Sequence, residues 1–131
     1  MQDFKKYTVL VVDDEETLRD TIVFDLTRKG FTVLSASNGK TAFEWVKTTR
    51  VHLVISDIRM PGGDGLTLLE QVRAYDPSLP VVIFITGFAD ITEAECLAKG
   101  AQSVVPKPFD RKLLMSSVLQ SLGVVDQVNA A

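Results

Sequence analysis

The chain alternates five times between a short apolar run and a longer segment with helical periodicity. The short runs cover residues 8–12, 31–35, 52–56, 81–85 and 102–105, and the longer segments cover 15–29, 40–49, 66–75, 90–99 and 110–122. Strict alternation of strand and helix is typical of βαβ units, in which helices cover both faces of a parallel sheet. We therefore predict an α/β domain with five parallel strands and five flanking helices.

The order of the strands follows from their polarity. The runs at 8–12, 53–55 and 81–85 are almost wholly apolar, which suits strands buried on both faces, whereas 31–35 alternates and 102–105 leads into Pro106, which suits edges. With right-handed crossovers, these properties favour the order 2-1-3-4-5 and a doubly wound, flavodoxin-like sheet. The first and third strands are then neighbours at the switch point, where open α/β sheets bind ligands.

Length and composition limit the class of protein. The 131 residues, with 46% hydrophobic and 24% charged side chains, predict a globular domain over residues 8–122, preceded by an extension at 1–7 and followed by a tail or the start of a linker at 123–131. Its net charge of −3 and its scattered Lys and Arg residues argue against direct nucleic-acid binding by this chain. A single cysteine and the lack of a long apolar run predict a cytoplasmic protein without a membrane segment.

Three carboxylates follow the two strands that meet at the switch point. Asp13 and Asp14 come directly after 9–12, and Asp57 comes at the end of 53–56. Because parallel strands end at the same edge, these acids converge and repel one another unless a cation lies between them. Mg²⁺ is held by one or two carboxylates and bridges to phosphate oxygens, so the sequence predicts a magnesium and phosphate site.

Two donors are expected at the same edge. Thr86 ends the fourth apolar run with a hydroxyl, and Lys107 follows the fifth with an ammonium group. An aspartate among these groups can attack phosphorus and form an aspartyl phosphate, with the donors stabilising the phosphoryl oxygens. We therefore assign Asp57 as the phosphoacceptor.

With these residues in place, the chain resembles the receiver domain of two-component response regulators over residues 8 to about 122. The resemblance lies in four separated motifs that occur in the family's order: Val12-Asp13-Asp14; Ser56-Asp57 with Met60-Pro61 and Asp64-Gly65; Ile85-Thr86-Gly87; and Lys107-Pro108-Phe109. It implies a phosphoacceptor switch whose own dephosphorylation is slow, rather than a turnover enzyme. Its implied partners are a sensor histidine kinase or phosphotransfer protein and an effector domain or target protein, and a homodimer through the fourth and fifth helices is allowed.

The resemblance also implies residue roles. Asp57 accepts the phosphoryl group, Asp14 binds Mg²⁺ directly, and Asp13 assists directly or through water. The backbone carbonyl of Arg59 completes the metal site. Thr86 and Lys107 sense the phosphate, and the Lys107-Pro108 peptide is expected to be cis.

This chain departs from the family pattern close to Lys107. Val104 stands where the family often has a Tyr or Phe that swings inward on activation, so readout by ring rotation is in question. Pro106 removes a backbone donor just before Lys107. Arg59 and Phe88 occupy positions that influence phosphate loss in the family, and we expect Phe88 to shield the phosphate from water.

Other interpretations stay open on sequence alone. Asp13 can cap the first helix with Glu16 in a capping box, and Asp64 and His52 suit structural roles. Asn38-Gly39 is interpreted as a turn, because Leu34 replaces the glycine that a P-loop requires. A metal-dependent phosphatase is a weaker alternative, since Arg59 stands where such enzymes carry a second aspartate. The third alternative is an interaction module that is not phosphorylated.

Overall fold

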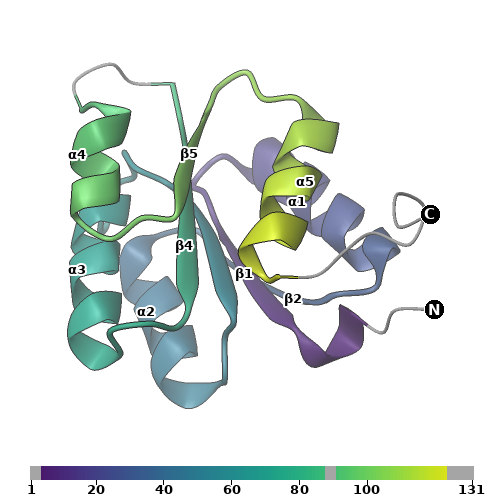
Figure 1. Ribbon diagram of the computed structural model, residues 1–131, viewed down its shortest axis with the longest axis horizontal. Helices are drawn as coiled ribbons and strands as arrows, with labels where there is room; N and C mark the ends of the chain where they lie inside the picture. The colour runs from purple at the N-terminus through teal and green to yellow at the C-terminus, as the bar shows by residue number, and fades with distance from the viewer. Residues whose placement is uncertain (1–3, 88–90, 124–131) are drawn as a thin grey trace.

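A central sheet of five parallel strands organises the computed structural model, which describes residues 4–87 and 91–123. The strands are β1 (Thr8–Val12), β2 (Thr32–Ala36), β3 (Leu53–Asp57), β4 (Val81–Thr86) and β5 (Ser103–Pro106). The helices are α1 (Glu16–Lys29), α2 (Gly39–Thr48), α3 (Gly65–Tyr75), α4 (Glu93–Ala98) and α5 (Arg111–Ser121), and a short 3-10 helix, η1 (Phe4–Lys6), precedes β1. The order β2-β1-β3-β4-β5 confirms the predicted topology (Figure 1).

The helices cover both faces of the sheet. Helices α1 and α5 lie on one face, and α2, α3 and α4 lie on the other (Figure 1). Successive residues of each strand point to opposite faces. Val9 and Val11 therefore pack with α1 and α5, whereas Leu10 and Val12 pack with the other helices.

The inner strands are apolar because both of their faces are covered. All five residues of β3 are buried, including the polar Ser56 and Asp57 at its carboxyl end. Strand β2 has exposed residues at Thr32 and Ser35, which agrees with its alternating sequence and its edge position. A buried strand thus carries Asp57 to the edge of the sheet.

Most predicted boundaries are correct to within a residue or two. Strands β2, β3 and β5 begin one residue later than their apolar runs suggest, and β4 continues through Thr86. Helix α4 begins at Glu93, not at Asp90, because Thr92 and Glu95 form a capping box. Asp90 itself lies outside the described residues.

Two sequence interpretations of helix starts are wrong. Gly39 is the first residue of α2 and not part of a separate turn, since the Asn38 side chain accepts a hydrogen bond from Thr41 N at 2.8 Å and caps the helix. Helix α1 has Glu15 as its N-cap residue and lacks a side-chain cap, so Asp13 and Glu16 do not form a capping box. Asp13 Oδ1 instead accepts a hydrogen bond from Glu15 N at 2.9 Å, in the turn before the helix.

Several structural roles were predicted correctly. Asp64 caps α3 by accepting from Thr67 N at 2.9 Å. His52 Nδ1 accepts from Thr8 N at 3.0 Å, which ties β1 to the start of β3. Among the described residues, no helix is both long enough and apolar enough to cross a membrane.

Candidate functional site

The register of the sheet brings four predicted site residues into a row. Val12 pairs with Ser56 and Asp57 pairs with Ile85, so Asp13 lies beside Asp57 and Thr86 follows on the other side. Thr86 pairs with Pro106, which places Lys107 next along the edge. The order of the strands, rather than the order of the sequence, thus assembles the site.

The three acids form a compact group. Each of Asp13, Asp14 and Asp57 offers a carboxylate oxygen, and these oxygens lie within 4.8 Å of one another. Asp13 and Asp57 are only 2% and 4% exposed, whereas Asp14 faces solvent. The carboxylates of Asp13 and Asp57 are therefore largely removed from water, whereas that of Asp14 lies on the solvent side of the group. A cation can enter from the Asp14 side.

Lys107 supplies the positive charge in this group. Its Nζ lies 2.9 Å from Asp57 Oδ2 and 3.4 Å from Asp13 Oδ2. Its backbone is fixed as well, because Lys107 N donates to Thr86 O at 2.9 Å. The Lys107-Pro108 peptide is cis, as the family resemblance implies.

Hydrogen bonds orient the Asp57 carboxylate. Its Oδ1 accepts from Ile58 N at 2.7 Å, while Oδ2 faces Lys107. Ser56 Oγ donates to the carbonyl of Asp57 at 2.7 Å, which fixes the backbone that carries the acid. The side chain is consequently held in one direction before any ligand arrives.

The electrostatics of the site follow from burial. Desolvation raises the pKa of Asp13 above its ordinary value and Asp57 adds to this, although the hydrogen bond from Glu15 N and the charge of Lys107 act against it. Burial lowers the pKa of Lys107, but the hydrogen bond to Asp57 and the charges of both acids outweigh it, so that the pKa is raised. Lys107 therefore stays cationic at neutral pH, whereas its surroundings disfavour the charged form of Asp13.

The remaining residues singled out in the sequence are Thr86, Arg59, Val104 and Phe88. Thr86 is 8% exposed at the end of β4, on the same edge as Asp57. The Arg59 side chain points toward Asp64, with Nη1 at 3.6 Å from Asp64 Oδ2. Val104 is half-buried and packs on the face that α4 covers. Phe88 lies outside the described residues.

Sequence reasoning missed two residues that shape the site. Arg19 Nη1 donates to the carbonyl of Asp13 at 2.9 Å and so holds the turn between β1 and α1. Gly65 lies so close to the carbonyl of Asp57 that a Cβ there would overlap it. The Asp64-Gly65 pair was a visible signal in the sequence, but nothing in it indicated a contact with Asp57.

The comparisons with known proteins agree with this geometry. The family model of the response regulator receiver domain matches residues 9–119. The chain belongs to the response regulator receiver domain family. Receiver domains are signalling switches that act with histidine kinases and effector domains, and they typically use Mg²⁺ at an acidic pocket.

Relatives in the family are longer than this chain. The DNA-binding transcriptional regulator NtrC of Azospirillum brasilense is 33% identical over 115 residues, which cover 88% of this chain and 24% of the relative. The C4-dicarboxylate transport transcriptional regulatory protein DctD of Rhizobium meliloti (strain 1021) is 38% identical over 111 residues, covering 84% and 24%. The chain thus spans about a quarter of the length of these curated relatives.

Solved structures show the same fold. The receiver domain of NtrX from Brucella abortus has a TM-score of 0.82 and 30% identity, and the match covers 89% of this chain and 99% of that one. A CheY-like receiver domain protein from Methanospirillum hungatei has a TM-score of 0.83 with 24% identity, covering 89% and 94%. Both support the doubly wound sheet, which confirms the predicted fold class.

Proposed function

We propose that Asp57 is the phosphoacceptor of this receiver domain and that Asp13, Asp14, Asp57 and the backbone carbonyl of Arg59 hold Mg²⁺ beside it. The observation that carries the proposal is the convergence of three carboxylates, a threonine and a lysine on one edge of the sheet. The carboxylate oxygens lie close enough together to share one ion, and oxygen ligands are those that Mg²⁺ prefers. When bound, Mg²⁺ supplies positive charge that offsets the carboxylates and the phosphoryl oxygens.

The residues of the chain divide the chemistry among them. An oxygen of Asp57 forms a new bond to phosphorus while the bond from phosphorus to the donor's histidine nitrogen breaks. Lys107 leaves Asp57 Oδ2 and pairs with the phosphoryl oxygens, and the hydroxyl of Thr86 donates to another of them. Ile58 N keeps Asp57 Oδ1 oriented during the transfer. Positioning and charge stabilisation therefore account for the reaction, and hydrolysis of the aspartyl phosphate by this chain is slow.

The donor is expected to dock next to Lys107. A cavity of about 480 Å³ opens there and is lined by Glu15, Leu18, Thr21, Lys107, Pro108, Phe109 and Arg111. Leu18 and Phe109 supply apolar area beside the phosphoacceptor edge. A histidine kinase or phosphotransfer protein that covers this cavity brings its phosphohistidine to Asp57.

The output is proposed to come from a partner that binds this domain. Phosphorylation changes how the α4-β5-α5 face binds an effector domain or target protein, and this face carries the exposed Leu97 and Leu113 that a homodimer would cover. NtrC is named as a DNA-binding regulator, and we assign any such activity to a separate effector domain.

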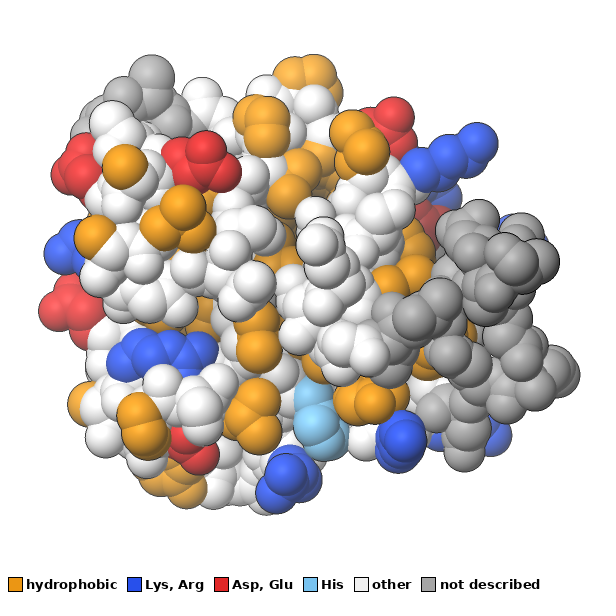
Figure 2. Space-filling model, viewed as in Figure 1, with side chains coloured by type: hydrophobic (Ala, Val, Ile, Leu, Met, Phe, Trp, Pro, Cys, Tyr) orange, Lys and Arg blue, Asp and Glu red, His pale blue; other side chains and the backbone are white. Residues whose placement is uncertain are grey.

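Acidic and basic side chains are interspersed on the face in Figure 2. Response regulators are generally cytoplasmic, and we propose the same location for this protein.

An interaction module without phosphorylation is a weaker candidate: the acidic set with Thr86 and Lys107 argues against it, and only Val104 supports it. A valine has no ring that can turn inward, so a readout here has to rely on Thr86 and the backbone of β5. The metal-dependent phosphatase is less well supported, because Arg59 cannot act as the second acid.

The experiment is phosphorylation by acetyl phosphate with Mg²⁺, followed by the intact mass of the protein. We expect one added phosphoryl group on the wild type and none on Asp57→Asn. Asp64→Asn is the matched control, since Asp64 caps α3 outside the site and the variant keeps Asp57. Modification of Asp57→Asn would reject the assignment of Asp57, an unmodified wild type would favour the interaction module, and continuous release of phosphate from p-nitrophenyl phosphate would favour the phosphatase.

A further inference from the structure

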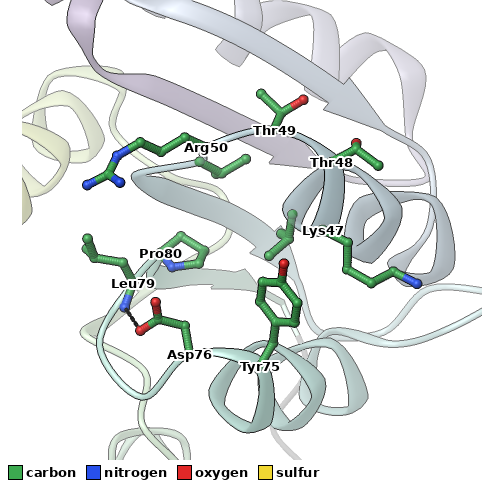
Figure 3. Close-up of a pocket in the computed structure, with 10 residues that line it drawn as sticks. Lys47, Thr48, Thr49, Arg50, Tyr75, Asp76, Leu79 and Pro80 are labelled. Atoms are coloured by element: carbon green, nitrogen blue, oxygen red, sulfur yellow. Dashed lines mark hydrogen bonds between the residues drawn. The ribbon is translucent and has the colours of Figure 1, made fainter.

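A cavity of about 350 Å³ lies at the amino-terminal edge of the sheet, at the opposite end of β3 from Asp57 (Figure 3). It lies where α2 leads into β3 and where α3 turns into β4. Its lining comprises Val46, Lys47, Thr48, Thr49, Arg50, Val51, Tyr75, Asp76, Leu79 and Pro80. None of these residues belongs to the phosphoacceptor site, so the cavity requires its own explanation.

The apolar part of the lining is unusually exposed. Val51 and Pro80 are buried, but Tyr75 and Leu79 are 57% and 37% exposed, and both belong to the small group of large apolar side chains that face solvent among the described residues. In Figure 3, Tyr75 and Leu79 lie on either side of Pro80, with Arg50 across from them. Apolar side chains exposed around a hollow indicate a binding surface.

Arg50 provides a positive charge that the described residues do not neutralise. No ion pair links Arg50 to a carboxylate in this part of the chain, whereas Lys47 is paired with Glu44 at 2.7 Å. Burial lowers the pKa of nearby His52, and the charge of Arg50 lowers it further. The guanidinium is thus open to an incoming carboxylate, which it can bind with two hydrogen bonds.

Asp76, the acidic residue that lines the cavity, already accepts hydrogen bonds within the chain. Asp76 Oδ1 accepts hydrogen bonds from Ser78 N at 2.8 Å and from Leu79 N at 3.0 Å, and these bonds lower the pKa of Asp76. Asp76 therefore stabilises its own turn and does not pair with Arg50. A ligand does not have to displace an internal salt bridge.

The segment from Asp76 to Pro80, which forms the wall across from Arg50, is held in place by Arg73. Arg73 Nη1 donates to the carbonyl of Asp76 at 3.0 Å, and its Nη2 donates to the carbonyl of Pro80. A wall that is already fixed loses less conformational entropy of its own when a ligand binds. Because α2 and α3 both end at this edge, their carboxyl ends disfavour an anion close to them. Arg50 follows the end of α2 directly, so its guanidinium has to offset this unfavourable field when a carboxylate binds.

We infer that this cavity binds an acidic segment of a partner protein. An aromatic or large aliphatic side chain of the segment packs against Tyr75, Leu79 and Pro80, and a neighbouring Asp or Glu pairs with Arg50. The exposure of Arg50, Tyr75 and Leu79 favours a peptide lying across the surface, since pockets for small molecules cover most of their ligand. The inference does not depend on phosphorylation of Asp57.

Titration of the ¹⁵N-labelled chain with blocked dipeptides tests both contacts. The probe is N-acetyl-Phe-Asp-amide, and the controls are the Phe-Asn and Ala-Asp peptides, each lacking one anchor. We expect saturable shifts of the Arg50, Val51, Tyr75 and Leu79 amides with Phe-Asp in the millimolar range, and at least severalfold weaker binding of both controls. An absence of saturable shifts, or equal affinity for Phe-Asp and Phe-Asn, would overturn the inference.

Variants of exposed residues assign the two contacts. Arg50→Gln is expected to abolish the preference for Phe-Asp over Phe-Asn, Tyr75→Ala to weaken both peptides, and Arg28→Gln, a change of an exposed cation on α1, to alter neither. Phosphorylation by acetyl phosphate in the same samples should be unchanged, because the cavity is separate from Asp57. If Arg50→Gln retains the full preference for Phe-Asp in a folded protein, the cavity does not bind the carboxylate as inferred.

Discussion

Lys107 Nζ lies 2.9 Å from Asp57 Oδ2, although 50 positions separate the two residues in the sequence. The same ammonium group is 3.4 Å from Asp13 Oδ2, so that one cation serves two carboxylates that are almost wholly buried. When no metal is bound, Lys107 therefore offsets the negative charge of both acids.

The first prediction concerns removal of this charge. In Lys107→Met, Asp13 and Asp57 remain buried without their partner, so we expect the free energy of unfolding without metal to fall by roughly 1–3 kcal/mol. Added Mg²⁺ should recover much of the loss, because binding to the folded state alone stabilises it. Urea unfolding with and without MgCl₂ measures both effects. Lys112→Met, at an exposed lysine of α5, is the control, and a loss that Mg²⁺ leaves unchanged would argue against a shared cation site.

The second prediction follows from the raised pKa of Asp13, which burial causes first and Asp57 increases. The folded chain keeps this proton at pH values where the unfolded chain, with an ordinary pKa of 3.8, has lost it. Stability from this group is therefore present at low pH and declines as the pH rises through the interval between 3.8 and the higher folded pKa.

Asp13→Asn should remove that decline and raise the metal-free Tm at pH 7 by a few degrees. It should also weaken the stabilisation by Mg²⁺, since a proposed ligand is lost. Thermal unfolding across pH, with and without MgCl₂, measures both. Asp14→Asn is the matched control, because Asp14 is exposed and its neutralisation should leave the metal-free Tm nearly unchanged. A lower metal-free Tm for Asp13→Asn would contradict the argument.

The fold was predictable because its main signals are local. The apolar run before Asp57 indicates a strand buried on both faces, and the alternating residues of β2 indicate an edge strand. Together with the right-handed crossovers, these two signals determine the strand order. The order in turn brings Asp13 beside Asp57. Residue types at strand ends were therefore sufficient to locate the acidic edge.

Features that depend on distances between segments were not predictable. No pattern in the sequence indicates that Lys107 reaches Asp13 as well as Asp57, because that depends on the register of β4 and β5. The start of α4 was misplaced because its apolar pattern did not reveal that Thr92 and Glu95 cap each other. The cavity beside Arg50 joins the ends of two helices and likewise has no sequence signature.

The third prediction concerns the ion pair that joins α1 to α5. Arg111 Nε donates to Asp25 Oδ2 at 2.7 Å, and this hydrogen bond with the charge of Arg111 lowers the pKa of Asp25 below 3.8 despite partial burial. A lowered pKa gives stability that is present above pH 3.8 and is lost as the pH falls through the folded pKa.

Asp25→Asn should therefore lower the Tm at pH 7 by a few degrees at most, since Arg111 is largely exposed and solvent screens the pair. The difference from wild type should shrink below pH 3.8 and in high salt. Asp20→Asn, at an exposed position of the same helix, provides the comparison. A difference that persists at low pH would mean that packing, not charge, is responsible.

The fourth prediction concerns Gly65, the first residue of α3. A Cβ at this position would overlap the carbonyl of Asp57 and approach Phe84 Cε1 to 2.9 Å, and both neighbours are fixed in the core. Gly65→Ala must push α3 away from β3, which should cost about 1–3 kcal/mol of stability and slow phosphorylation of Asp57 by acetyl phosphate, because the acid moves with its backbone. Urea unfolding and intact mass measure the two effects. Gly87→Ala, whose Cβ would meet Lys107 only at 3.6 Å, should fold normally, and equal stability losses in both variants would show that the contact with Asp57 is not the cause.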